Sequence, residues 1–337
     1  MKLETRTLQR SREIWKRSIA CAKQLYTETA DGFKTFEMGD LGANATLAVS
    51  LLYDYQMTGC KESLEKGFAV LDAWITLARS KEGHLLTRYG SKDDVIDAYN
   101  LGIAGCQLVE AYELAKLLGY NKPEYWQVAL DICDFAIRRQ REGGMGISWN
   151  PDGSPRELVG IAGSFLILAL AEVAIRTKLK KYHVAAVRAY SYYYREFQKK
   201  GCGTSDALNA SCIDKQSVVP LLTGGVRMYE ESGFEKYLDM AQDVANYLAA
   251  GQAPQQVETS AINYVNALDK LAEYTGNNEW KQRALKIWRS GIQNIAEDDK
   301  PENIPTVQAC ALWLETLRKT ENWNWLDGLM ENGGNNL

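Results

Sequence analysis

The stretch RMYEESGFEKYLDMAQ, Arg227–Gln242, decides the fold. Apolar and aromatic residues lead into a turn at Ser232 and Gly233, and Tyr237 and Leu238 follow at helical spacing. Glycine suits the left-handed backbone conformation that ends a helix, and an aromatic residue after the turn packs the second helix against the first. The stretch therefore predicts a helical hairpin.

The same phrase recurs along the chain. Clear copies are LLYDYQMTGCKESLEKGFAVL at Leu51, EAYELAKLLGYNKPEYWQVAL at Glu110 and KLAEYTGNNEWKQRALKI at Lys270. Weaker copies begin at Leu168, where the glycine is missing, and at Leu312. The period of roughly 43 to 60 residues is too long and uneven for an open helical array. A closed ring of hairpins fits this pattern better.

The helices before and after each turn differ in character. Those before it, such as LVGIAGSFLILALAEVA, are rich in small and apolar residues and belong inside, whereas those after it, such as EKYLDMAQDVANYLAAGQ, are amphipathic and belong outside. Inner helices are expected to begin near Asp40, Asp94, Glu157, Asp214, Glu258 and Ile304. The only segments that resemble strands are short loop pieces such as HLLTRYG and GISWN.

The two ends of the chain complete the ring. The sixth inner helix has no full-length outer partner after it, and the N-terminal segment LETRTLQRSREIWKRSIACAKQLYTET is a helix with no inner partner before it. If these two pack together, the ring closes head to tail. We predict an all-α (α/α)6 toroid of six helical hairpins that forms a single domain over residues 1–337.

Composition narrows the class of function. A net charge of −4, from 39 basic and 43 acidic residues, gives no reason to expect a nucleic acid or an anionic membrane as partner. The N-terminus is charged throughout and no stretch is apolar enough to span a bilayer, so we expect a cytoplasmic location. Seven scattered cysteines without a CxxC pair, and only two histidines, make a zinc site hard to build. We expect neither metal nor cofactor.

The long loops all connect an outer helix to the next inner helix, so they gather on one rim of the ring, where a ligand pocket would form. Acids at this rim are Asp40, Asp94, Asp97, Asp152, Glu157, Asp206, Asp214 and Glu258, and the aromatics beside them are Phe33, Phe36, Tyr89, Tyr99 and Trp149. A carboxylic acid can protonate a leaving oxygen, a second carboxylate can activate water, and flat rings stack on a sugar. The rim therefore favours a carbohydrate ligand.

The repeated turns resemble those of the six-hairpin glycosidase superfamily. Within the chain, SKDDVIDAYNLG and GISWNPDGSPRELVGIAGSFLILALAEV resemble the segments that carry the acids of unsaturated glucuronyl and rhamnogalacturonyl hydrolases. This resemblance implies a glycoside hydrolase that acts on an unsaturated-uronate or plant-derived oligosaccharide, with Asp94 or Asp97 as one acid and Asp152 as the other. Arg88 and Arg156 could clamp a uronate carboxylate. Further substrate contacts are expected from Tyr89, Tyr99, Trp149, Glu157, Asp206 and Asp214.

Other interpretations stay open. Aspartate is a preferred helix N-cap, so each rim acid also has a purely structural explanation. These hydrolases carry an aromatic and arginine signature at the third inner helix where this chain reads ELVGIAGSF, which favours a non-catalytic glycan-binding or scaffold toroid as the alternative. The run DDVID, residues 93–97, also matches the DDxxD motif of terpene synthases, although no second metal motif accompanies it. Epimerases on the same toroid use a histidine pair. An oligomer is compatible with all these interpretations.

Overall fold

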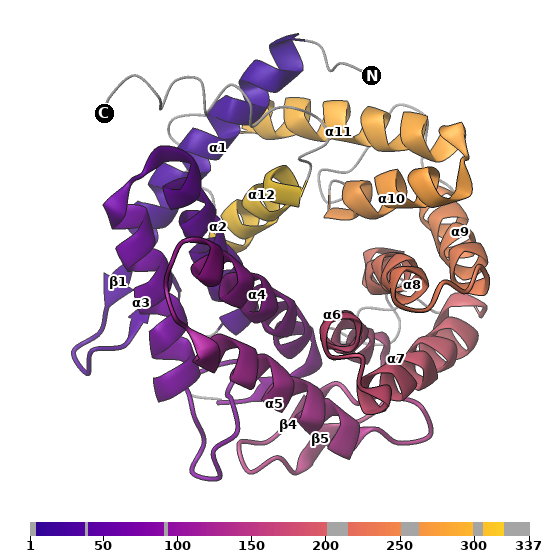
Figure 1. Cartoon of the computed structure of the whole chain (residues 1–337), viewed down its shortest axis with the longest axis horizontal. Helices are drawn as coiled ribbons and strands as arrows, with labels where there is room; N and C mark the ends of the chain where they lie inside the picture. Colours follow the sequence, from indigo (N-terminus) through magenta and orange to yellow (C-terminus); the bar gives the residue numbers. More distant parts are fainter. Residues whose placement is uncertain are drawn as a thin grey trace.

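The computed structural model describes residues 5–37, 40–90, 94–200, 215–250, 263–298 and 306–319. In these residues the α-helices alternate between two concentric rings (Figure 1). The inner ring consists of α2 (Leu41–Thr58), α4 (Ala98–Leu117), α6 (Leu166–Thr177), α8 (Val219–Ser232), α10 (Val265–Thr275) and α12 (Val307–Lys319). The outer ring consists of α1 (Thr5–Leu25), α3 (Lys61–Leu77), α5 (Pro123–Arg139), α7 (Lys180–Tyr193), α9 (Lys236–Ala249) and α11 (Asn278–Asp298). The predicted all-α (α/α)6 toroid is confirmed.

The hairpin turns form as the repeated phrase predicts. Gly59, Gly233 and Gly276 end α2, α8 and α10 in the left-handed conformation, with φ of 70°, 72° and 65°. The third hairpin lacks the glycine, and Lys178 takes the left-handed conformation in its place, with φ of 56°. After the turn, the aromatic ring of Tyr237 is buried against the neighbouring hairpin. The left-handed turn therefore forms in the third hairpin even though the glycine that favours it is missing.

Closure of the ring is also confirmed. The last inner helix, α12, packs against α1 and α2, so the N-terminal helix supplies the sixth outer partner (Figure 1). Arg318 of α12 is 2% exposed and donates to Gln107 Oε1 of α4 at 2.8 Å and to Ser50 Oγ of α2 at 3.1 Å. A buried guanidinium thus joins three inner helices where the two ends of the chain meet.

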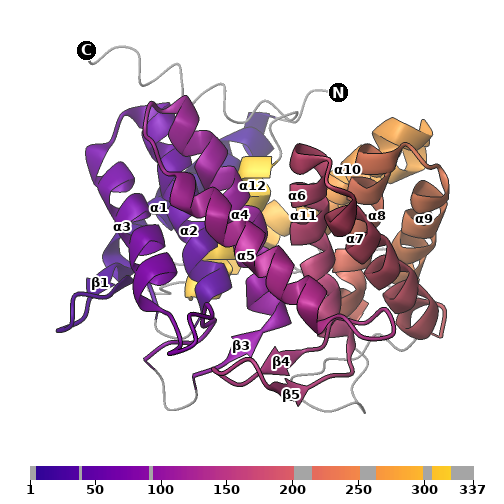
Figure 2. The ribbon, with the colours of Figure 1, turned by 60° about the horizontal axis from the view of Figure 1, so that its bottom comes forward.

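Short strands extend from the end of the ring at which the inner helices begin (Figure 2). A two-stranded sheet joins β1 (Thr27–Glu28) to β2 (Lys34–Thr35), and a three-stranded sheet has the order β3 (Ile96–Asp97), β4 (Ser148–Trp149) and β5 (Pro155–Glu157). The GISWN segment was expected to be strand-like and contains β4, but β1, β2, β3 and β5 were not predicted. Strands of two or three residues are too short to show a period in the sequence.

Several inner helices begin later than expected. Asp94 precedes β3, and α4 begins only at Ala98. Glu157 ends β5, and a 3₁₀ turn, Ile161–Phe165, precedes α6. The strand pairing occupies residues that the apolar pattern assigns to helix. Asp214 and Glu258 lie outside the described residues. Among the described residues, no helix combines the length and apolar character that crossing a bilayer requires.

Candidate functional site

Two aspartates, Asp40 and Asp97, lie near one another where the inner helices α2 and α4 begin, a region we call the axial mouth. Asp40 caps α2, since its Oδ1 accepts the Ala43 amide at 2.9 Å, and Asp97 caps α4, since its Oδ1 accepts the Asn100 amide at 2.8 Å. The Gly42 amide donates to Asn100 Oδ1 at 2.8 Å, and Asn100 Nδ2 donates to Asp97 Oδ2 at 3.1 Å. The buried Asn100 therefore connects the two helix starts and holds the two carboxylates in one group.

The packing around this connection is tight. A Cβ atom on Gly42 would lie 2.7 Å from Asn100 Oδ1, closer than any real side chain approaches. The hydroxyl of Thr87 donates to Asp97 Oδ2 at 2.5 Å, and the Asp97 amide donates back to Thr87 Oγ1 at 3.0 Å. Three donors thus fix the orientation of the Asp97 carboxylate.

Asp40 lies in a different electrostatic environment. Burial raises the pKa of Asp40 above the ordinary value of 3.8, and the neighbouring charge of Asp97 raises it further. The Ala43 amide, Gln308 of α12, whose Nε2 is 3.3 Å from Asp40 Oδ2, and the charge of Arg88 offset part of this effect. A carboxylic acid that holds its proton more firmly than usual beside a second carboxylate has the properties of a general acid.

Tyr99 belongs to the same group. Its side chain is 45% exposed, and its ring meets Phe165 edge-on with the centroids 4.6 Å apart. Although nearly half of the side chain is exposed, the protein atoms around Tyr99 displace part of its hydration and raise its pKa to about 12, with further contributions from Asp40, Glu315 and Asp97. Tyr99 therefore stays protonated near neutrality and can both donate a hydrogen bond and offer a ring face to a ligand.

Some predicted residues fall close to the mouth. The strand register aligns Asp97 with Ser148 and Ser148 with Glu157, which places Asp97 and Glu157 in one row, about 10 Å apart across two strand spacings. Arg88 is exposed and close enough to influence Asp40. Tyr89 is half-buried, and its ring lies 4.8 Å from that of Phe33.

Other predicted residues are not brought to the mouth. Asp152 lies exposed in the turn between β4 and β5 and shares a cavity with Arg139 at the end of α5. Its Oδ1 accepts the Ser154 amide at 2.8 Å, and bonds from Ser154 lower the pKa of Asp152. Asp152 therefore has Ser154 and the end of α5 as its surroundings, and its pairing with Asp94 or Asp97 stays a prediction.

The remaining predicted positions have varied surroundings. Trp149 is 0% exposed and packs edge-on against Phe135, so the structure does not present it as a stacking surface for a sugar. Asp94 is half-buried, and its Oδ1 has no hydrogen-bond partner among the described residues. Arg156 is exposed on β5. Asp206, like Asp214, lies outside the described residues.

Sequence reasoning counted Asp40 among the rim acids but did not select it for catalysis. Its position at the start of the first inner helix was visible, whereas its closeness to Asp97 was not, because the two belong to different helices. The histidines do not form a pair: His84 meets Phe135 of α5, and the ring of His183 on α7 contacts Glu231. The histidine pair used by toroid epimerases is therefore not formed by these two residues.

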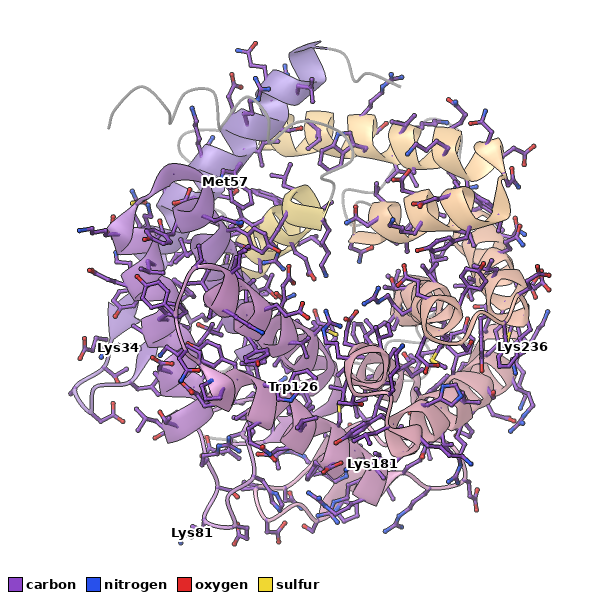
Figure 3. All side chains as sticks on the ribbon, viewed as in Figure 1. Lys34, Met57, Lys81, Trp126, Lys181 and Lys236 are labelled. Carbon is purple, nitrogen blue, oxygen red and sulfur yellow. The ribbon has the colours of Figure 1, made fainter. Side chains whose placement is uncertain are left out.

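A second region lies inside the ring toward the ends of the inner helices, where their side chains project into the centre (Figure 3). A cavity of about 420 Å³, which we call the axial floor, is lined there by charged residues that include Glu113, Glu172, Arg176, Arg227 and Glu230. This cavity is lined by charged and apolar residues together, whereas a terpene synthase calls for an apolar cavity, and Asp93 of the DDVID run lies outside the described residues. Among the described residues, no group of three or more histidine, cysteine or acidic side chains is arranged to hold a metal ion.

Solved structures share this architecture. An unsaturated glucuronyl hydrolase specific for heparin is similar with a TM-score of 0.69 at 14% identity, over 95% of this chain and 98% of that one. An inactive variant of an α-1,6-mannanase of Salegentibacter sp., changed at two consecutive aspartates and bound to α-1,6-mannotriose, gives 0.66 at 15% identity, over 91% and 98%. A sugar epimerase from a ruminal bacterium gives 0.66 at 11% identity, over 93% and 98%.

Three activities on one scaffold show that the likeness extends to the fold and not to the reaction. No protein-family model matches the sequence, and no curated protein matches it. The chain thus has the fold of the six-hairpin glycosidases, and its reaction has to be argued from its own residues.

Proposed function

We propose that the chain is a glycoside hydrolase in which Asp40 is the general acid and Asp97 is the partner carboxylate. The observation that carries this proposal is the juxtaposition of the two at the axial mouth, where Asp40 holds its proton above the ordinary aspartate range beside a second carboxylate. Asp97 is fixed by three donors and lies at the start of a helix, an environment that suits negative charge.

The two roles correspond to the steps of glycoside hydrolysis. Asp40 would donate its proton to the leaving oxygen, while Asp97 would activate water or stabilise the positive charge on the sugar. Tyr99 would contact the sugar beside them. Arg88 and Glu157 would bind its polar groups, and a guanidinium at this position favours a uronate substrate. The glucuronyl hydrolase on the same fold supports a uronate as the first substrate to test.

A second candidate rests on the adjacent pair at residues 93 and 94. The mannanase variant named above was inactivated at two consecutive aspartates, and this chain has consecutive aspartates just before the second inner helix. Asp94 has a buried oxygen without a partner among the described residues, as expected for a group that awaits a ligand. An α-1,6-mannan therefore belongs in the substrate panel, with Asp94 as the diagnostic residue.

The test is turnover on a panel of unsaturated-uronate oligosaccharides, plant-derived oligosaccharides and α-1,6-mannan, followed by reducing-sugar release and by loss of the double bond's ultraviolet absorbance. The variants are Asp40→Asn, Asp97→Asn, Asp94→Asn, Glu157→Gln and Asp152→Asn. We expect the first two to lower turnover by about 10²- to 10⁴-fold while staying folded. Full activity in Asp40→Asn would refute its role as acid, and loss in Asp152→Asn would restore the acid pair predicted from the sequence. Binding without any turnover would identify a glycan-binding toroid instead.

A further inference from the structure

A cluster of arginines lies on the outside of the ring, away from the axial mouth. Arg138 and Arg139 end α5, and Arg141 follows in a tight turn closed by mutual backbone hydrogen bonds with Gly144. All three arginines line one cavity of about 240 Å³, whose other wall is the turn between β4 and β5. We call this the outer arginine cavity.

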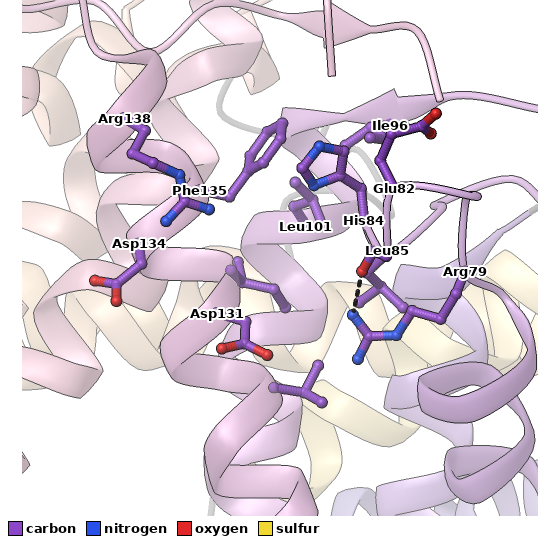
Figure 4. Close-up of a pocket in the computed structure, with 13 residues that line it drawn as sticks. Arg79, Glu82, His84, Leu85, Ile96, Leu101, Asp131, Asp134, Phe135 and Arg138 are labelled. Carbon is purple, nitrogen blue, oxygen red and sulfur yellow. Dashed lines mark hydrogen bonds between the residues drawn. The ribbon is translucent and has the colours of Figure 1, made fainter. Parts of the chain in front are cut away.

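A neighbouring cavity of about 260 Å³ also has Arg138 in its lining, together with the acids Glu82, Asp131 and Asp134. Figure 4 shows this neighbour, with Arg138 and Phe135 of α5 on one side and His84 on the other.

Among the residues that the structure describes, no ion pair neutralises the charges of the cluster. No carboxylate of the described residues forms an ion pair with Arg138, Arg139 or Arg141, although a lysine on the neighbouring α7, Lys181, is paired with Asp134 at 2.6 Å. One carboxylate, Asp152, lines the cavity, against three guanidinium groups. The arginines also influence His84. Burial lowers the pKa of His84, and the positive charges of Arg139 and Arg138 lower it further.

The cavity is also preorganised. The guanidinium of Arg139 lies over the ring of Phe135, 5.2 Å from its centroid. Gly153 in the β4–β5 turn has φ of 77°, and a Cβ atom there would lie 2.5 Å from Arg139 Nη2 and 2.9 Å from His84 Nε2. The turn is held by the Ser154 amide bonded to Asp152 and by Asn150 Nδ2 bonded to Ser154 Oγ at 3.0 Å. The glycine lets the guanidinium approach a rigid wall.

The helix dipole explains only part of the cluster. Cations are favoured in the last turn of a helix, which accounts for Arg138 and Arg139. Arg141 lies beyond the end of α5, yet it lines the same cavity. Three like charges around one hollow repel one another, and an anion between them would relieve that repulsion. The planar fork of arginine suits a carboxylate or sulfate, which accepts two parallel hydrogen bonds.

We propose that the outer arginine cavity binds the oxyanion group of an acidic sugar, either a uronate carboxylate or a sulfate ester. That the oxyanion belongs to a sugar rests on the proposed function, whereas oxyanion binding itself does not. The three-stranded sheet extends from Asp97 at the mouth, through β4 and β5, to this cavity. An acidic glycan held at the mouth can therefore continue along the sheet to a second anchoring point.

The test measures binding by calorimetry at low ionic strength with glucuronate, glucose 6-sulfate and glucose as matched probes. The wild-type chain should bind at least one of the two anions and not the neutral sugar, and the tighter anion identifies the oxyanion. The double variant Arg138→Gln/Arg141→Gln changes two exposed side chains and should weaken anion binding at least about tenfold. Arg195→Gln, which removes a charge that is 67% exposed beyond the end of α7, is the matched control.

A further variant tests the sign of the field. Asp152→Asn keeps the turn-forming side chain and removes the one carboxylate of the cavity, so it should strengthen anion binding, an effect that a structural role alone would not produce. Equal binding of glucose, no anion binding, or equal affinities in the double and control variants would overturn the inference. Turnover, measured separately on the panel, tests the axial mouth: arginine-dependent binding without turnover upholds this inference while the hydrolase fails.

Discussion

The two ends of the axial space treat buried acids in opposite ways. At the floor, burial works against the ionised form of Glu172, but the charges of Arg227 and Arg176 hold its pKa below the ordinary value. At the mouth, burial and the neighbouring Asp97 raise the pKa of Asp40. The same ring of inner helices therefore shifts the pKa of one acid down and the pKa of the other up.

The partners explain this difference. Arg176 binds Glu113 through two bonds of 2.6 and 2.9 Å and reaches Glu172 at 2.5 Å, and Arg227 joins Glu172 at 2.5 Å and also binds Glu230. These ion pairs link α4, α6 and α8 in succession. At the mouth, two carboxylates lie near one another, and Arg88, whose charge lowers the pKa of Asp40, is exposed. Charges paired as at the floor indicate a structural role, whereas two neighbouring acids that no described cation binds in an ion pair indicate a reactive one.

The largest expected effect is on turnover at the mouth. Asp40→Asn keeps a side chain able to cap α2 but removes the proton donor, so turnover on the substrate found by the panel should fall about 10²- to 10⁴-fold. Steady-state kinetics measure this loss, and circular dichroism verifies the fold. Glu172→Gln at the floor is the matched control, since it should leave turnover per folded molecule unchanged. Equal losses in the two variants would remove the distinction between mouth and floor.

The next effect is on stability near the floor. Arg318→Ala removes a guanidinium that is 2% exposed and leaves Gln107 and Glu110 without their shared partner, so the free energy of unfolding should fall by about 3–5 kcal/mol. Urea denaturation measures this change. Turnover per folded molecule should stay the same, because the residue holds the ring closed and does not reach the mouth. A change below about 1 kcal/mol would show that α12 is held by its apolar packing alone.

Gly42→Ala should have a smaller effect, which lowers both stability and turnover. The new methyl group would meet Asn100 Oδ1 at 2.7 Å and disturb the connection between the two aspartates, with a loss of about 1–3 kcal/mol in stability and a fall in turnover. Gly233→Ala is the control, because its cost of about 1–2 kcal/mol arises from the left-handed conformation at a hairpin turn far from the mouth. Equal turnover in both variants would show that the Asn100 connection does not position the carboxylates.

The ring was predictable because its signals are local. Each hairpin turn and each stripe of small residues lies within one repeat. The site was harder because the closeness of Asp40 and Asp97 depends on contact between separate helices. Trp149 was predicted to stack on a sugar, but the pairing of β4 with β3 buries it, and the turn after β4 carries Asp152 to the end of α5. Two-residue strands leave no trace in the hydrophobic pattern.

The smallest expected effect is the pH dependence of stability at the mouth. Because the pKa of Asp40 is raised in the folded chain, its protonated form favours folding, and that contribution is present below the ordinary value of 3.8 and lost as the pH rises through the folded value. Asp40→Asn cannot ionise. Its melting temperature should therefore match that of the wild-type chain in acid and exceed it near neutrality. Scanning calorimetry across this pH range measures the sign of the difference in melting temperature. Glu172→Gln should show the opposite sign, because it removes a carboxylate whose pKa is lowered in the folded chain.

Burial of Asp40 lowers the stability of the wild-type chain near neutrality, and the proposed catalysis needs this buried acid. A variant that gains stability near neutrality while it loses turnover would therefore locate the trade-off between stability and activity at Asp40. A lower melting temperature at neutral pH would mean that the carboxylate is stabilised by its surroundings, and the acid would then have to be sought elsewhere in the mouth.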